Sequence, residues 1–132
     1  MSQKELEVIL TRQLASYLAM PIFIVDPAGS LVYYNEPAEA ILGRRFEETG
    51  EMGVAEWSQL FEPLDKDGRP LPSALLPLVI TLRTRTPAHR DFWINNVDGR
   101  RVHLEVTSIP LIGQASRFLG GMAVFWEVEE PG

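Results

Sequence analysis

Met20 to Gly43, "MPIFIVDPAGSLVYYNEPAEAILG", decides the fold of this chain. "PIFIVD" is an apolar run of strand length, and "PAG" is a turn signal because Pro27 fixes φ and Gly29 allows a positive φ. "SLVYYN" predicts a second strand, and Asn35 is a good N-cap for a helix through "EPAEAIL". The stretch therefore predicts strand, turn, strand and helix, and its polar residues are explained by turns and caps.

Composition limits the classes of protein that this chain can belong to. With 132 residues, 45% of them hydrophobic and 23% charged, the sequence predicts one globular domain. The net charge of −6 disfavours nucleic acids and anionic membrane surfaces as partners, and the basic residues form only short, interrupted groups. No signal peptide or membrane-spanning run is evident, so we expect a cytoplasmic location.

The segment before the first strand, "KELEVILTRQLASYLAM", has apolar residues at helical spacings of three and four. Pro21 forces Met20 out of helical geometry, so we expect an amphipathic helix that ends near Ala19. The apolar stripe consists of Leu6, Ile9, Leu10, Leu14, Tyr17 and Leu18.

The middle of the chain predicts two more helices. A short helix around Val54 to Phe61 places Trp57 and Phe61 one turn apart, so we expect both side chains in the core. "SALLPLVITLRTR", from Ser73 to Arg85, predicts a helix capped by Ser73, in which Pro77 fits only the first turn.

The last third is rich in strands. The Asp98-Gly99 pair between two alternating runs, "RDFWINN" and "RVHLEVTSIPL", predicts a hairpin, and "RFLGGMAVFWEVE" predicts a final strand. We expect this final strand to be covered on both sides. Its two faces carry Met122, Val124, Trp126 and Val128 on one side and Ala123 and Phe125 on the other.

Together these elements predict an α+β domain with a five-stranded antiparallel sheet. Their order and residues resemble a PAS domain, a sensory module of bacterial signalling proteins. The resemblance covers roughly Leu18 to Val128 and rests on the opening stretch, on "DKDGRPLPSALLPLVITL", and on "DGRRVHLEVTSIPL" followed by "GGMAVFWEVEE".

The resemblance implies helices on one face of the sheet around a small pocket, and an N-terminal flanking helix that covers the other face and pairs with a second copy. The expected division is a flanking helix at 1–19 and a PAS domain at 20–130. Many members end in Asp-Val/Ile-Thr, whereas this chain has Glu127-Val128-Glu129, which departs from the usual link to an effector. We expect the effector, such as a histidine kinase or another output domain, beyond this sequence or on another polypeptide.

From this architecture we expect a homodimer built on the flanking helix. Leu6, Ile9 and Leu10 are expected to pair across the two chains. Leu14, Tyr17 and Leu18 are expected to anchor the helix on the outer face of the final strand, at Ala123 and Phe125. On the opposite face, the expected pocket and core residues are Trp57, Phe61, Met122, Val124 and Trp126.

No cofactor or metal is predicted. The chain has no cysteine, which excludes disulfides, thiolate ligands and flavin photochemistry through a cysteinyl adduct. A haem site needs an axial histidine on the pocket, but His103 shares the polar face of its strand with Arg101 and Glu105, and His89 is expected in a loop after Pro87. We therefore expect both histidines to be solvated. The aspartates lie at turns and strand ends, where carboxylates cap the backbone, and no calcium-binding loop is present.

No nucleophile motif or phosphate-binding loop is present, so we expect no enzymatic activity. Two functions stay open. One is a sensory module that binds a small ligand or a partner and relays the change through its N-terminal helix and dimer interface. The other is a constitutive dimerisation scaffold with a self-filled pocket. An internal cavity of about 300 Å³ or more would favour ligand sensing.

Overall fold

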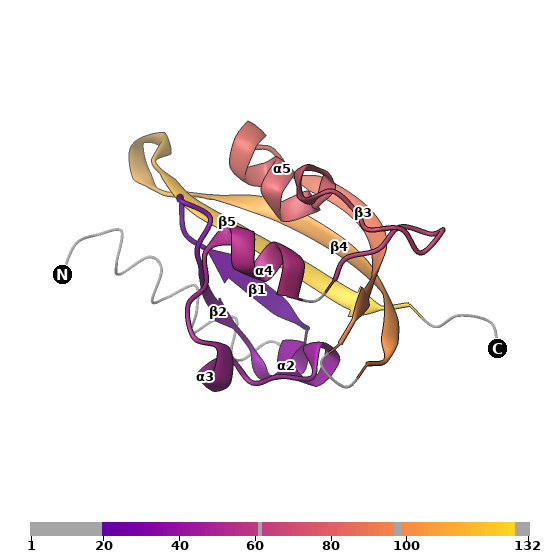
Figure 1. The fold of residues 1–132 in the computed structure, drawn as a ribbon. Coiled ribbons are helices and arrows are strands. Elements are labelled where there is room, and N and C mark those ends of the chain that lie inside the picture. The colour runs from indigo at the N-terminus through magenta and orange to yellow at the C-terminus, as the bar shows by residue number, and fades with distance from the viewer. Residues whose placement is uncertain (1–19, 61, 97–98, 129–132) are drawn as a thin grey trace.

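A computed structural model describes residues 20–60, 62–96 and 99–128 of the chain. Within these ranges five strands form one antiparallel sheet in the order β2-β1-β5-β4-β3, with the helices against one face (Figure 1). The strands are β1 (Ile22–Val25), β2 (Leu31–Tyr34), β3 (Ala88–Asn95), β4 (Arg101–Ile112) and β5 (Phe118–Glu127). The helices are α2 (Glu36–Leu42), α3 (Phe46–Thr49), α4 (Val54–Leu60) and α5 (Pro77–Thr84), with 3-10 turns at Ser73–Leu75 and Gln114–Ser116. The predicted α+β class and sheet are confirmed, whereas the flanking helix lies outside the described residues.

Asn35 joins the first hairpin to α2, as the opening stretch predicts. Its Oδ1 accepts hydrogen bonds from the Ala38 amide at 3.2 Å and from the Ile22 amide at 3.0 Å. Its Nδ2 donates to the carbonyl oxygen of Met20 at 2.8 Å. One buried side chain therefore caps α2 and also fixes the start of β1, a second role that the cap signal alone does not reveal.

The helix expected from Ser73 to Arg85 is shorter than predicted, and Ser73 does not cap it. Ser73–Leu75 forms a 3-10 turn, Leu76 is extended, and α5 begins at Pro77. The reason is that proline disfavours helical geometry in the residue before it and suits the first position of a helix.

The hairpin predicted at Asp98-Gly99 is confirmed, since β3 and β4 pair in register from Asn95 and Arg101 outward. The expectation that His89 lies in a loop is wrong, because β3 begins at Ala88 and His89 pairs with Thr107. Alternation along β4 is as predicted: Val102, Leu104 and Val106 are buried on one face, and Arg101, His103 and Glu105 alternate with them.

The strand β5 lies at the centre of the sheet, between β1 and β4. Gly120, with a φ of 127°, passes so close to β1 that a Cβ there would lie 2.1 Å from the carbonyl oxygen of Val25. A Cβ on Gly121 would lie 3.0 Å from Cδ1 of Leu78 in α5. The two glycines therefore allow β1 and α5 to approach the central strand closely.

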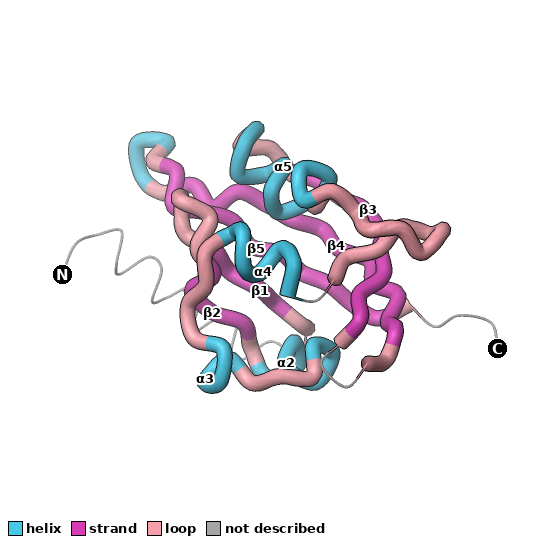
Figure 2. The backbone as a smooth tube through the Cα atoms, in the orientation of Figure 1, coloured by secondary structure: helices cyan, strands magenta, loops and turns pink. Residues whose placement is uncertain are grey.

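Buried side chains form one cluster on each face of the sheet. The larger cluster lies under the helices, which Figure 2 shows in front of the strands, and it includes Phe23, Val25, Ala123 and Phe125. The smaller one lies on the other face, where Ile22 and Ile24 are buried. Packed around these two isoleucines are Val32, Tyr33, Leu111, Met122 and Val124. We refer to this second group as the outer cluster.

Candidate functional site

The candidate site is a pocket between the helices and the sheet, with about 80 Å³ of free space. Every strand except β2 contributes to its wall, together with α2, α4 and α5. The lining residues are Phe23, Leu42, Trp57, Pro63, Leu76, Pro77, Leu78, Phe92, Ile94, Leu104, Val106, Ala123 and Phe125. All thirteen side chains are apolar or aromatic, so the pocket has a hydrocarbon wall.

Trp57 is placed in this wall by two contacts. Its ring meets Phe23 edge to face, with the ring centroids 5.4 Å apart. Its Nε1–H donates to the carbonyl oxygen of Gly29 at 2.7 Å, which ties α4 to the turn between β1 and β2. Gly29 has a φ of 91°, and a Cβ added there would lie 3.4 Å from side-chain atoms of Val54 and Leu82. The indole therefore presents its carbon face to the pocket while its N–H is bonded elsewhere.

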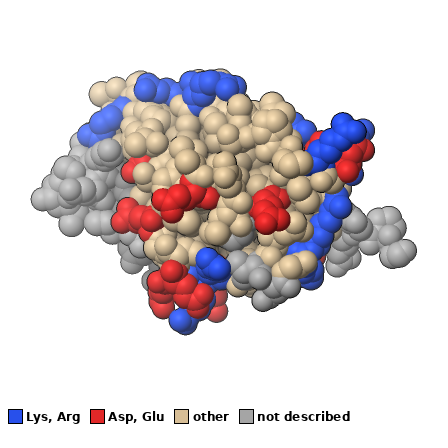
Figure 3. Space-filling view, in the orientation of Figure 1, with Lys and Arg blue, Asp and Glu red and all other residues tan. Residues whose placement is uncertain are grey.

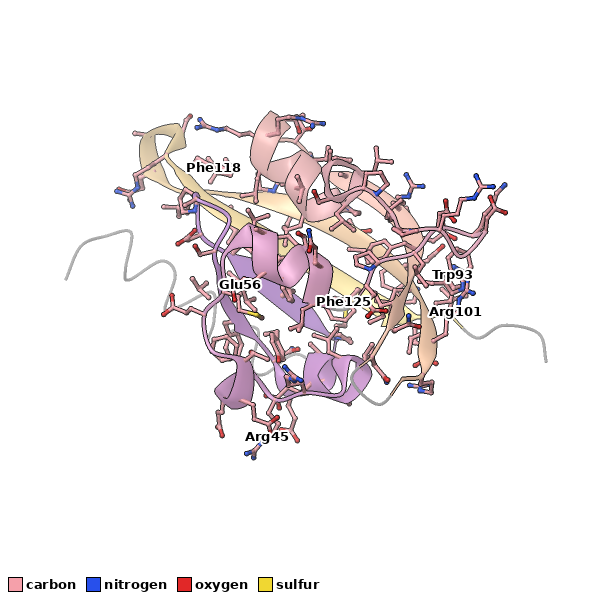
Figure 4. All side chains as sticks on the ribbon, viewed as in Figure 1. Arg45, Glu56, Trp93, Arg101, Phe118 and Phe125 are labelled. Carbon is pink, nitrogen blue, oxygen red and sulfur yellow. The ribbon has the colours of Figure 1, made fainter. Side chains whose placement is uncertain are left out.

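The sequence-based assignment of the two faces of β5 is wrong. Ala123 and Phe125, expected on the outer face, line the pocket, and Figure 4 labels Phe125 at the centre of the view, near α4. Met122 and Val124, expected in the pocket, belong to the outer cluster, and Trp126 is 38% exposed.

The reason for this error is that β5 is a central strand with apolar residues on both faces, so alternation alone does not show which set of side chains faces the helices. Small residues do not show this either, because Gly120 and Gly121 stand side by side and so lie on opposite faces, and only Gly121 lies beneath Leu78 of α5. The remaining pocket candidate, Phe61, lies outside the described residues, as do Leu6, Ile9, Leu10, Leu14, Tyr17 and Leu18.

Both histidines lie on the outer face of the sheet. His103 Nε2 is 2.9 Å from Oδ2 of Asp91, and the His103 ring stacks on Trp93 with the centroids 4.0 Å apart. The hydrogen bond from His103 is the main cause that lowers the pKa of the Asp91 carboxyl. His89 contacts Thr107 Oγ1 through Nδ1 at 2.7 Å.

The side chain of His103 is only 15% exposed, so the expectation of a solvated histidine is wrong for it. Arg101 completes this cross-strand group, with its guanidinium carbon 5.5 Å from the centre of the Trp93 ring (Figure 4). Sequence reasoning missed the group, although the hairpin that it predicts between β3 and β4 is what pairs Trp93 with His103.

The pocket does not fit a large cofactor. Pockets for drug-sized ligands have volumes of about 300–1,000 Å³ and a few well-placed polar groups, whereas this one has about 80 Å³ and an apolar wall. A haem would need an axial ligand, and both imidazoles are on the opposite face of the sheet from the pocket.

Two aspartates among the described residues accept hydrogen bonds from backbone amides in turns. Asp26 Oδ1 accepts from the amides of Ala28 and Ser30, and Asp65 Oδ1 accepts from those of Asp67 and Arg69. Backbone hydrogen bonding at Asp65 lowers the pKa of its carboxyl. In the described part of the chain, no group of three or more His, Asp or Glu side chains could hold a metal ion.

The charged residues form small groups on the face drawn in Figure 3, where Lys and Arg are separated by uncharged or acidic residues. Two ion pairs join Arg45 with Glu48 and Arg100 with Glu127, each at 3.3 Å. None of the helices in the described ranges has the length and apolar character needed to cross a bilayer.

Comparison with known proteins gives matches at the level of structure. No protein-family model matches the sequence, and no curated protein matches it. Among solved structures, the PAS domain of BvgS from Bordetella pertussis is 17% identical, with a TM-score of 0.65 over 94% of this chain and 87% of that one. The PAS domain of nitrogen regulation protein NR(II) from Vibrio parahaemolyticus is 23% identical, with a TM-score of 0.63 over 90% and 98%.

A third similar structure is the LOV protein of Rhodobacter sphaeroides, which is 13% identical. Its TM-score is 0.71, and the match covers 99% of this chain and 71% of that chain. At these identities the likeness establishes the fold.

Proposed function

Since the chain has the PAS fold, we propose that it is a non-catalytic sensory module of signal transduction. In this proposal a small ligand or a protein partner changes the packing of the domain, and the change passes through the N-terminal helix and a homodimer interface. Structurally similar PAS domains include one from a two-component sensor histidine kinase, which supports a kinase or another output domain as the effector. We propose that neither nucleic acid nor a membrane is a partner. We also propose a cytoplasmic location.

The observation that carries this proposal is the outer cluster. Ile22 and Ile24 follow directly on Met20 and Pro21, where the chain arrives from residues 1–19. The same face carries Ile109 and Trp126, which are 37% and 38% exposed. Apolar surface next to an amphipathic segment is where we expect that segment to dock.

We therefore propose that Leu14, Tyr17 and Leu18 pack on the outer cluster. Met122 and Val124 replace Ala123 and Phe125 as the anchor, because only the former two face outward. Leu6, Ile9 and Leu10 then pair with their copies in a second chain, and twofold symmetry brings identical surfaces together.

Light scattering on the full chain and on a chain that lacks residues 1–17 tests this arrangement. We expect a dimeric mass for the full chain and a monomeric mass for the shortened one. Equal masses for the two proteins would show that the helix is not the dimer interface. Thermal unfolding of the shortened chain serves as the control, since a cooperative transition shows that the sheet is still folded.

The size of the pocket favours a second candidate, a constitutive dimerisation scaffold. Its volume of about 80 Å³ is well below the approximately 300 Å³ expected of a site for a drug-sized ligand. A scaffold keeps the same dimer fraction and the same amide hydrogen exchange with and without small molecules. A sensory module changes hydrogen exchange in the outer cluster when its ligand or partner binds.

No coloured cofactor is part of this proposal. The purified protein is expected to show no absorbance bands beyond the aromatic region. A Soret band or a flavin spectrum after reconstitution would contradict this expectation.

A further inference from the structure

We propose that the pocket binds one small neutral molecule that lacks hydrogen-bonding groups, of the size of xenon or a short hydrocarbon. The assignment deepens the sensory function proposed above and rests on that function for its biological role, but not for the binding itself. It follows from the volume of the pocket, from the chemistry of its wall and from the elements that meet there.

The volume sets the size of the ligand. An apolar cavity of about 150 Å³ in another protein accepts benzene or xenon, and the present pocket has about 80 Å³. On this scale roughly three or four carbon-sized atoms fit without rearrangement. The space is therefore too large to count as ordinary packing and too small for a sugar, a nucleotide or a flavin.

The wall sets the chemistry of the ligand. Among the lining residues only Trp57 carries a side-chain donor, and its N–H is already bonded to the carbonyl oxygen of Gly29. The buried hydroxyl groups of Thr81 and Ser108 bond to each other at 2.6 Å and are not part of the wall. A carboxylate or an amide placed here would lose its hydrogen bonds to water without replacement.

A ligand in the pocket would contact strands that also form the outer face of the sheet. Its wall includes Phe23 of β1, Trp57 of α4, Leu78 of α5 and Phe125 of β5. Phe23 and Phe125 alternate along their strands with residues of the outer cluster, so the two clusters share the same backbone. A molecule held in the pocket therefore contacts the strands whose other face carries the proposed dimer surface.

Methyl NMR of the full chain under xenon pressure tests the site, with xenon as the probe. We expect saturable shift changes in the lining methyl groups of Leu42, Leu104 and Ala123. The methyl groups of Val32, Leu111 and Val124 in the outer cluster are expected to show only small, non-saturating changes. If the lining methyl groups of the unmodified chain do not saturate, the proposal is wrong.

A matched pair of substitutions locates the binding. Val106→Ile adds one methyl group to the pocket wall, whereas Val124→Ile adds the same group on the other face of the sheet. We expect xenon affinity to fall several-fold in Val106→Ile and to stay unchanged in Val124→Ile. Ala123→Val narrows the same pocket from β5 and gives a second test if Val106→Ile does not fold. Equal affinity in the pocket and outer variants would overturn the assignment.

Polar probes test the proposed ligand class separately from the proposed sensory function. Succinate and flavin mononucleotide are expected to give no saturable shifts at the lining methyl groups. If either of them saturates those signals, the ligand class is wrong while the sensory function stands. If xenon binds as expected but residues 1–17 make no difference to the oligomeric mass, the binding site stands while the proposed relay fails.

Discussion

Phe125 and Trp126 are neighbours on β5, yet Phe125 is 4% exposed and Trp126 is 38% exposed. The difference arises because successive side chains of a strand point to opposite faces of the sheet. Phe125 joins the core under the helices, and Trp126 lies on the face that carries both histidines. On the helix-covered face, neighbouring elements fill almost all the space, whereas the outer face keeps large apolar and aromatic groups accessible.

The outer face itself has two parts. Over β1 and β5 it carries the outer cluster, and over β3 and β4 it carries Trp93, His103, Asp91 and Arg101. The first part is suited to burial beneath an apolar partner, and the second forms a polar and aromatic surface. The helix-covered face thus holds the larger buried cluster, while the outer face combines a smaller apolar cluster with a polar and aromatic group.

The largest test of this contrast compares Phe125→Ala with Trp126→Ala. Phe125→Ala removes a buried ring from the core and is expected to lower the free energy of unfolding by about 3–5 kcal/mol. Trp126→Ala is expected to cost less than about 1.5 kcal/mol, because its side chain is already partly in water. Urea denaturation of both variants measures the difference. Similar urea midpoints for the two variants would mean that the two side chains contribute equally to the free energy of unfolding.

Trp57→Phe tests the hydrogen bond that ties α4 to the first hairpin. The change leaves the carbonyl oxygen of Gly29 without the indole donor, and we expect a loss of about 1–3 kcal/mol. Trp126→Phe on the outer face is the matched control and should change stability by less than about 0.5 kcal/mol. If the two variants unfold at the same urea concentration, the Trp57 bond adds nothing to stability.

Thr81→Val and Ser108→Ala probe the buried hydroxyl pair between α5 and β4. Each single change leaves one buried hydroxyl without its partner and is expected to cost about 1–2 kcal/mol, since an unmade buried hydrogen bond is expensive. The double variant is expected to cost little more than one single variant. A double-mutant cycle by urea denaturation measures this coupling, and purely additive costs would contradict it.

The smallest effect on the free energy of unfolding is expected at Asp91 on the outer face. Because His103 lowers the pKa of Asp91 in the folded protein, the ionised carboxylate stabilises the fold above its unfolded pKa of about 3.9. That contribution is lost as the pH falls through the lower pKa of the folded state. The group is largely exposed, so screening by water limits the effect to about 0.2–1 kcal/mol.

Unfolding of the wild type and of Asp91→Asn between pH 7 and pH 2 measures this contribution. We expect the wild type to be the more stable at pH 7, with the difference closing at acidic pH. Asp67→Asn removes the same charge from a loop and serves as the control. A difference that does not depend on pH would show that the Asp91–His103 contact is not electrostatic.

Local signals in the sequence predict most of the fold. Asn35 caps α2 as predicted, and β3 and β4 form the predicted hairpin, in which the Gly99 amide donates to the carbonyl oxygen of Asn96. Pro77 is informative in the same way. It disfavours helical geometry at Leu76, so the helix begins at Pro77, four residues beyond the expected Ser73. Where a residue dictates its own geometry, sequence reasoning is accurate.

The site is harder to predict because it depends on contacts between distant segments. Alternation shows that Ala123 and Phe125 share a face, but which face meets the helices is decided by the packing of α5 against β5. The volume of the pocket likewise results from thirteen side chains drawn from several elements and their connecting loops. His103 is a further example, since its ring is shielded from water by the Trp93 ring on the neighbouring strand.

The position of β5 between β1 and β4 has a consequence for how the chain folds. Ile22 pairs with Val124, so the strand synthesised first among the five joins the strand synthesised last, about 100 residues later. Such distant pairing requires a large loop to close, which slows folding relative to helical proteins. The sheet can therefore be completed only after β5, the last strand along the chain, has been synthesised and has paired with both β1 and β4.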